Sequence, residues 1–150
     1  MGQTLVQNYL HIVFSTKNRE PLISSEIEND LHAYLGGIAN NLDCPPIKVG
    51  GYTDHIHILT ALSKNIALKD LLTELKSASS KWIKTVDRKY KKFYWQDGYG
   101  AFSVNLKDLN NVINYIANQH EHHRKKTFQE EFLEFLKQNN VEYNEKFLWT

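Results

Sequence analysis

The chain has 150 residues, of which 41% are hydrophobic, and this excludes a disordered protein while allowing the core of one domain. Its net charge of +1 does not by itself indicate a nucleic-acid-binding protein, and its single cysteine, Cys44, excludes an internal disulfide and a thiolate metal site. No apolar run approaches the ~20 residues that span a bilayer, and the segment 1–9 lacks the layout of a signal peptide. We therefore expect one cytoplasmic domain covering residues 1–150.

In the first half of the chain, runs of β-branched and aromatic residues alternate with a helical pattern. Residues 8–15 (NYLHIVFS) have the composition of a strand, and Ser24 or Ser25 can cap the helix that follows. After two prolines that break the chain, the runs 47–52 and 55–62 predict two more strands joined by a turn.

The second half carries three apolar stripes at helical spacing and one further strand pattern. The longest stripe predicts a helix over 67–86, and the run 94–104 predicts a strand that is broken locally at two glycines. A helix opening near Asp108 and an amphipathic helix beginning at Phe128 follow. The order βαββαβ predicts an α+β, ferredoxin-like (split βαβ) fold: an antiparallel sheet with two helices on one face, and a C-terminal helical extension over about 128–150. The other face is left for a ligand, a partner or the extra helices.

The motif His55-Ile56-His57 lies on the third predicted strand. Because strand side chains alternate between faces, Ile56 should point to the helix-covered core, and the two histidines should stand together on the other face. Their Cα atoms would be roughly 6.5–7 Å apart, which allows both imidazoles to converge on one metal ion. Such a pair taken alone is more often ordinary surface or core histidine, so the interpretation depends on a second motif.

That second motif is the pair Tyr115 and Gln119, which are neighbours on one helix face because they are four residues apart. Two neutral imidazoles and one amide oxygen form a site with open positions, which suits Mg²⁺ or Mn²⁺ bound to phosphate oxygens. Tyrosine, with a free pKa of ~10, is a poor nucleophile and needs a phosphate that is held in line and polarised. The two motifs together predict attack on DNA that leaves a phosphotyrosine and a free 3′-hydroxyl.

The sequence resembles the single-tyrosine HUH transposases, a family that includes the REP-associated tyrosine transposases. The resemblance covers nearly the whole chain, and its most specific parts are HIVFSTKNR (11–19), GGYTDHIHIL (50–59), WQDGYGAFSV (95–104) and NYIANQ (114–119). It implies that Tyr115 is the catalytic nucleophile and that His55, His57 and Gln119 are the metal ligands, with Mg²⁺ or Mn²⁺ as cofactor.

The resemblance also implies a substrate and an assembly. Members of this family cleave and rejoin single-stranded DNA through a 5′-phosphotyrosine, and they excise and insert small insertion sequences after recognising hairpins near the ends. The resemblance further implies an obligate homodimer, in which the tyrosine helix of one subunit can act in trans on the metal site of the other. Three alternatives stay open: a phosphodiesterase that uses water, a non-catalytic ferredoxin-like nucleic-acid-binding module, and a domesticated processor of repeated palindromic DNA.

Basic residues gather in two segments despite the low net charge. The predicted phosphate contacts are Lys81, Lys84, Arg88, Lys89, Lys91, Lys92, Arg124 and Lys125. Aromatic residues interleave with the first segment and could stack unpaired bases, although we expect Phe93 or Trp95 to be a core residue.

The remaining polar candidates receive structural interpretations. Asp54 could orient a ligand imidazole, but we expect it to serve the turn, because an adjacent strand residue points to the opposite face from His55. We expect the histidines that follow the tyrosine helix to interact with the helix dipole or with phosphate, rather than to form a second metal site. These are His120, His122 and His123. Two further histidines without evident partners, His11 and His32, are predicted to be structural.

Overall fold

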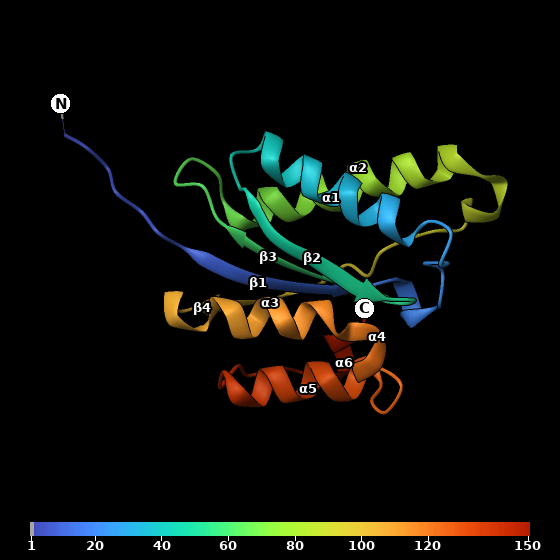
Figure 1. Cartoon of the computed structure of the whole chain (residues 1–150). Coiled ribbons are helices and arrows are strands. Elements are labelled where there is room, and N and C mark those ends of the chain that lie inside the picture. The colour runs from blue at the N-terminus through green and yellow to red at the C-terminus, as the bar shows by residue number, and fades with distance from the viewer. Residues whose placement is uncertain (1) are drawn as a thin grey trace.

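A computed structural model describes residues 2–150 and shows one four-stranded antiparallel sheet with helices on both faces (Figure 1). The strands are β1 (Tyr9–Ser15), β2 (Pro46–Tyr52), β3 (His55–Ala61) and β4 (Gly100–Val104). They lie in the order β2-β3-β1-β4, with β1 and β3 in the centre. This order is the split βαβ arrangement, so the predicted ferredoxin-like α+β fold is confirmed. None of the helices within residues 2–150 is long and apolar enough to cross a bilayer.

The helices α1 (Glu28–Asn41) and α2 (Leu68–Val86) cover one face of the sheet (Figure 1). The central strands direct alternate apolar side chains to this face, and all of them are buried: Ile12, Phe14, Ile56 and Ile58. Both helices contribute leucines to the same apolar cluster. Burial of this apolar surface is the main stabilising contribution on this side of the sheet.

The first helix begins later than its sequence predicts. The sequence predicts Ser24 or Ser25 as its cap, but α1 starts at Glu28 and its first turn has no side-chain cap. The Ser24 hydroxyl shares a hydrogen bond with the Tyr90 hydroxyl (2.6 Å) and is therefore not available as a cap. The backbone carbonyl of Ser24 instead accepts from Ile27 N and Glu28 N, which forms a turn that leads into the helix.

The predicted strand over 94–104 is shorter in the structure. Only Gly100–Val104 pairs with β1, and Trp95 adds a single bridge to Thr16. Between them the Gln96 side chain replaces a strand partner, because its Oε1 accepts from Ser15 N at 2.8 Å. Gly100 is required for packing, since a Cβ there would lie 2.5 Å from Phe132 Cε1.

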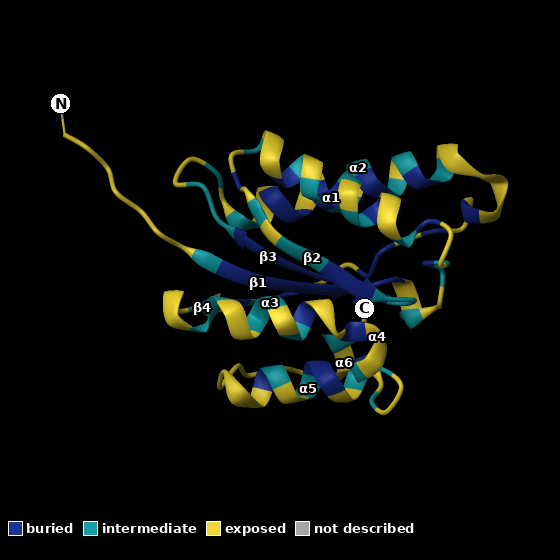
Figure 2. Ribbon diagram, in the orientation of Figure 1, coloured by how far each residue is buried: buried dark blue, intermediate teal, exposed yellow. Residues whose placement is uncertain are grey.

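Four helices cover the opposite face of the sheet (Figure 1). They are α3 (Leu109–Ala117), α4 (Gln119–His122), α5 (Phe128–Gln138) and α6 (Glu145–Leu148). A second apolar cluster joins Val13 and Phe102 of the sheet to Phe128, Phe132 and Leu136 of α5. The extra helices therefore occupy the face that the sequence left for them, and Figure 2 shows the central strands buried between two helical layers. Short 3₁₀ turns lie at Lys17–Arg19, Arg88–Tyr90 and Leu106–Asp108.

Candidate metal centre

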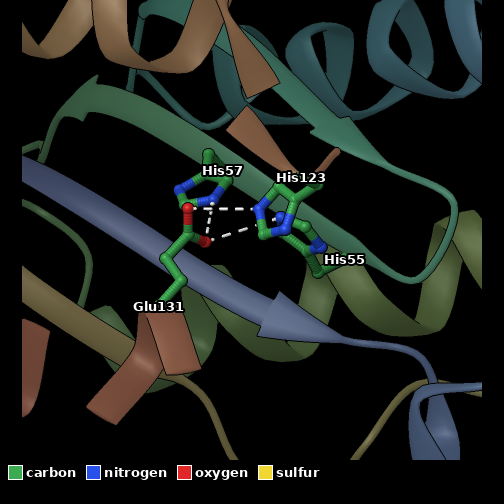
Figure 3. Close-up of side chains that lie close together, drawn as sticks. All are labelled: His55, His57, His123 and Glu131. Carbon is green, nitrogen blue, oxygen red and sulfur yellow. Dashed lines mark hydrogen bonds and ion pairs between the residues drawn. The ribbon is translucent and has the colours of Figure 1, made fainter. Parts of the chain in front are cut away.

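The His55 and His57 side chains lie together beneath α3, α4 and α5. Both are fully buried, whereas their neighbour Ile56 points into the apolar cluster under α1 and α2. The alternation predicted for this strand is therefore observed. The ring centroids of the two histidines are 5.0 Å apart (Figure 3). The Nε2 atom of His55 faces Gln119, and that of His57 faces Glu131.

Tyr115 and Gln119 reach the same place from the end of α3 and the start of α4. Gln119 Oε1 lies 2.9 Å from His55 Nε2, and Gln119 Nε2 donates to the Tyr115 carbonyl at 3.3 Å. The Tyr115 ring centroid is 5.8 Å from that of His57. The structure thus brings the four predicted residues together within one chain.

Glu131 of α5 is a site residue that the sequence interpretation missed. It is 1% exposed, and its Oε1 lies 2.9 Å from His57 Nε2. Its Oε2 accepts hydrogen bonds from the Tyr115 hydroxyl and from Gln119 Nε2. The sequence does contain a sign of this role, because Glu131 lies in the apolar stripe of α5 between Phe128 and Phe132. A carboxylate in such a stripe needs a buried partner.

His123 also belongs to this cluster, contrary to its predicted role at a helix end. Its Nε2 lies 2.9 Å from Gln119 Oε1 and 3.2 Å from Glu131 Oε2, while its Nδ1 donates to the Lys126 carbonyl. One candidate ligand atom from each of four residues lies within 4.8 Å of the others: His55, His57, His123 and Glu131. Figure 3 shows these four side chains converging, and the cluster could hold a metal ion.

The other two histidines after α3 lie at the margin of the cluster. His122 Nε2 is 3.2 Å from the Tyr115 hydroxyl, and exposed His120 pairs with Glu28 at 2.6 Å.

Two residues predicted to be structural support the histidine pair. Asp54 Oδ1 lies 2.7 Å from His55 Nδ1, because the turn redirects the Asp54 side chain towards the face on which His55 lies. His11 Nε2 lies 2.7 Å from His57 Nδ1, from the neighbouring strand. Each contact fixes one ring nitrogen and leaves Nε2 directed at the cluster, which is how outer partners orient metal-binding histidines. His32 lies outside this network and keeps its structural interpretation.

The protonation states in this cluster suit metal ligands. Burial lowers the pKa of His57 to about 4 and that of His11 to about 3, so both imidazoles are neutral near pH 7. Burial opposes ionisation of Glu131, but hydrogen bonds from His123 and His57 outweigh it and lower the pKa of this carboxyl. A neutral His57 and an ionised Glu131 are the forms that bind divalent metals. For His123, hydrogen bonding and charge from Glu131 outweigh burial and raise the pKa. Burial and the Glu131 carboxylate together raise the pKa of Tyr115, which keeps its hydroxyl protonated.

The predicted phosphate contacts lie on the surface, apart from this cluster. Seven of the eight are exposed and Lys84 is half-buried; some pair with acids, such as Lys89 with Glu26 and Arg124 with Glu121. Both basic segments border the turn after β1. Lys17 N donates to the Tyr94 carbonyl near the first segment, and Asn18 and Arg19 line a hollow with the second.

The structure corrects the stacking interpretation for most of the aromatic residues in the first segment. Tyr90, Phe93 and Trp95 are buried, so they are not available to stack bases, and the core interpretation of Phe93 and Trp95 is confirmed. Tyr94 remains exposed, with Lys84 Nζ 4.1 Å from its ring centroid.

Comparisons with solved structures agree with this fold. A crystal structure of a candidate transposase from Deinococcus radiodurans R1 aligns with a TM-score of 0.63 and 20% identity, over 79% of this chain and 96% of that one. The structure of a REP-associated tyrosine transposase bound to a REP hairpin aligns with a TM-score of 0.61 and 13% identity, over 82% of this chain and 73% of that one. At these identities both likenesses show the fold. Among curated proteins, no sequence matches significantly.

The family assignment comes from the sequence itself. Residues 4–119 match the family described as "Transposase IS200 like", a span that includes β1 to β4, α3 and the residues His55, His57, Tyr115 and Gln119. The C-terminal helix α5, which supplies Glu131, lies outside the matched residues. The chain belongs to the IS200-like transposase family.

Proposed function

We propose that this transposase cleaves and rejoins single-stranded DNA through a covalent 5′-phosphotyrosine at Tyr115, with a divalent metal ion at the buried cluster. The observation that carries the proposal is the meeting of Tyr115 and Gln119 with His55 and His57 in one chain, with Gln119 Oε1 2.9 Å from His55 Nε2. These four residues come from separate segments of the family-matched region, and no packing requirement explains why so many polar groups are buried together.

The donor set fits a divalent metal. His55 Nε2, His57 Nε2 and Gln119 Oε1 are the predicted ligands, and His123 Nε2 and a Glu131 oxygen are within reach of the same ion. A mixed set of imidazole, amide and carboxylate groups suits Mn²⁺ or Mg²⁺. Such an ion, when bound, would polarise a phosphate oxygen and offset the charge that develops during attack.

The nucleophile in this proposal is Tyr115. Its hydroxyl faces Glu131 and lines the groove between α3 and α5, so a phosphodiester entering this groove would meet the hydroxyl next to the cluster. Attack forms the bond between Tyr115 Oη and phosphorus and breaks the bond to the 3′ oxygen. The hydroxyl proton is released, and the departing 3′ oxygen gains a proton. The reverse attack by a 3′-hydroxyl reseals DNA without a nucleotide cofactor.

The DNA partner is proposed to be a strand with hairpins near the cleavage positions. The fold is similar to that of a transposase bound to a REP hairpin, and two exposed basic segments border the turn after β1. Lysines and arginines around a turn can bind phosphates on either side of a hairpin stem.

A covalent-adduct assay tests the chemistry. Purified protein is incubated with labelled single-stranded DNA from both flanks of its gene, with and without Mn²⁺, and the products are separated on a denaturing gel. We expect a metal-dependent adduct that Tyr115→Phe abolishes and that the matched control Tyr143→Phe, an exposed tyrosine, retains. Tight binding without any adduct would contradict the tyrosine mechanism and favour a binding module.

Subunit mixing tests the assembly. The predicted homodimer stays a prediction, and its trans form requires that Tyr115 of one subunit serve the histidines of the other. We propose action in cis, because Gln119 contacts His55 and Tyr115 contacts Glu131 within one chain. Mixing Tyr115→Phe with His57→Ala protein should then give no adduct, whereas adduct formation in the mixture would establish the trans arrangement.

A further inference from the structure

A hollow of about 290 Å³ lies between α3 and α5, directly beside the Tyr115 hydroxyl. Its residues lie on one face of each helix, with Asn111 and Tyr115 four residues apart on α3. On α5 the face runs from Glu131 through Phe135 to Gln138. The hollow therefore begins at the proposed nucleophile and ends at two amide side chains.

We propose that this hollow binds the base of a nucleotide adjoining the scissile phosphate, and that it prefers bases with an exocyclic amino group over thymine. The inference rests on the proposed function, since it places the phosphate at Tyr115. It goes further by naming a base-reading pocket in which one wall is α5, an element outside the residues matched by the family.

The size and shape of the hollow fit one base. Ligand pockets for whole small molecules begin near 300 Å³, so this volume holds a single ring system rather than several nucleotides. Asn111 lies four residues before Tyr115, which corresponds to about 6 Å along the helix axis. This is close to the distance from a phosphorus atom to the base of its own nucleotide. A phosphate at Tyr115 would thus place its base beside Asn111.

The chemistry of the walls favours a base over a phosphate. Phe135 offers a ring that already packs edge-on against Tyr115 and His11, and aromatic side chains stack unpaired bases. The exposed amides of Asn111 and Gln138 each present a donor beside an acceptor, the pattern that pairs with a base edge.

One carboxylate sets the preference. Glu134 lines the hollow, is exposed, and can accept hydrogen bonds from amino groups, whereas both oxygens of Glu131 already bond to Tyr115, Gln119 and the histidines. Lys126 holds Glu134 through both carboxylate oxygens at 2.6 and 2.7 Å, which fixes its position and leaves further lone pairs free. Thymine has no exocyclic amino group to donate, whereas adenine, cytosine and guanine do.

A selection among random substrates tests the pocket. Single-stranded oligonucleotides with randomised positions are incubated with the protein and Mn²⁺, covalent adducts are recovered, and both the linked and released strands are sequenced. We expect roughly tenfold enrichment of amino-bearing bases over thymine at one position next to the linked phosphate. Asn111→Leu and Gln138→Met should reduce that preference, and the matched control Asn110→Leu, on the adjacent exposed position of α3, should keep it.

The outcomes separate this inference from the proposed function. Adducts that form without a base preference at either neighbouring position, or with a preference that both pocket variants keep, would overturn the pocket and leave the tyrosine chemistry intact. A complete lack of adducts with wild-type protein would overturn the proposed function and the pocket with it.

A binding measurement needs no cleavage. Deoxyadenosine and deoxycytidine should shift the side-chain amide NMR signals of Asn111 and Gln138. Thymidine should need a concentration at least about tenfold higher to give the same shift. Equal responses to all three nucleosides would contradict the pocket.

Discussion

The two faces of the sheet come from the same strands but are closed by different chemistry. Towards α1 and α2, β1 and β3 present Ile12, Phe14, Ile56 and Ile58 to a mainly apolar cluster. Towards α3 to α5, the residues one position away include His55 and His57, which meet Gln119, His123 and Glu131. One face is held by apolar burial, which depends little on pH or ligands. The other combines the apolar cluster under α5 with a polar network whose stability depends on protonation and on bound metal.

The apolar face should show the largest effect on stability. Ile58→Ala removes a fully buried side chain between the sheet and its helices, and it should lower the free energy of unfolding by about 2–5 kcal/mol in urea titrations. Ile47→Ala, on the exposed edge strand β2, is the matched control and should cost less than about 1 kcal/mol. Metal affinity of the folded Ile58→Ala protein should remain unchanged. A parallel loss of metal affinity would show that the two faces are not independent.

The polar face should make the metal-free protein sensitive to acid. Burial lowers the pKa of His57 to about 4 and of His11 to about 3, both from 6.5. Between those values and 6.5 the unfolded chain binds protons that the folded chain does not, so the stability contributed by these two histidines is complete above pH 6.5 and is lost as pH falls towards 4. Glu131 raises the pKa of His123, whose contribution has the opposite sign and is lost as pH rises. The loss attributable to His57 is on the order of a few kcal/mol. Urea titrations in chelator across this range measure it, and His11→Phe should flatten the slope.

Glu131 should contribute to metal binding although it lies outside the family-matched residues. Glu131→Gln keeps the side-chain shape but removes the charge that faces His57 and His123, so Mn²⁺ affinity measured by calorimetry should fall by about 100-fold. Glu130→Gln, an exposed neighbour on α5, is the matched control. Unchanged affinity in Glu131→Gln would exclude this carboxylate from the metal centre and limit its role to holding Tyr115.

The residues that orient the histidines should have smaller effects. Asp54→Asn weakens the partner of His55 Nδ1 without touching the metal, and affinity should fall roughly 10-fold. Asp43→Asn, at the exposed end of the loop before β2, serves as a control. A fall as large as that of Glu131→Gln would indicate that Asp54 binds the ion directly.

The sequence predicts the apolar face better than the polar one, for a physical reason. Apolar periodicity is a local signal, so the strand carrying Ile56 and the helices over it could be placed from composition and spacing. The pair His55 and His57 was also visible, because alternation along a strand is local. The roles of His123 and Glu131 could not be predicted, because they depend on how α5 packs across the sheet. No local sequence pattern indicates that long-range contact. The first turn of α1 and the start of β4 were misplaced because Ser24 and Gln96 bond to distant partners.

The basic segments should give the smallest effect and should separate surface electrostatics from the buried cluster. Arg124→Ala and Lys125→Ala each remove one exposed charge beside the turn after β1, and neither touches the metal ligands. If each binds one phosphate, the slope of log K against log salt for single-stranded DNA should become shallower by about 0.7 per substitution. Lys69→Ala, an exposed lysine of α2, is the matched control. Fluorescence anisotropy over a range of salt concentrations, in chelator, measures the slopes without cleavage. Equal slopes in all variants would show that DNA does not contact the α4–α5 connection. A shallower slope with unchanged metal affinity would show that this surface binds DNA independently of the buried metal cluster.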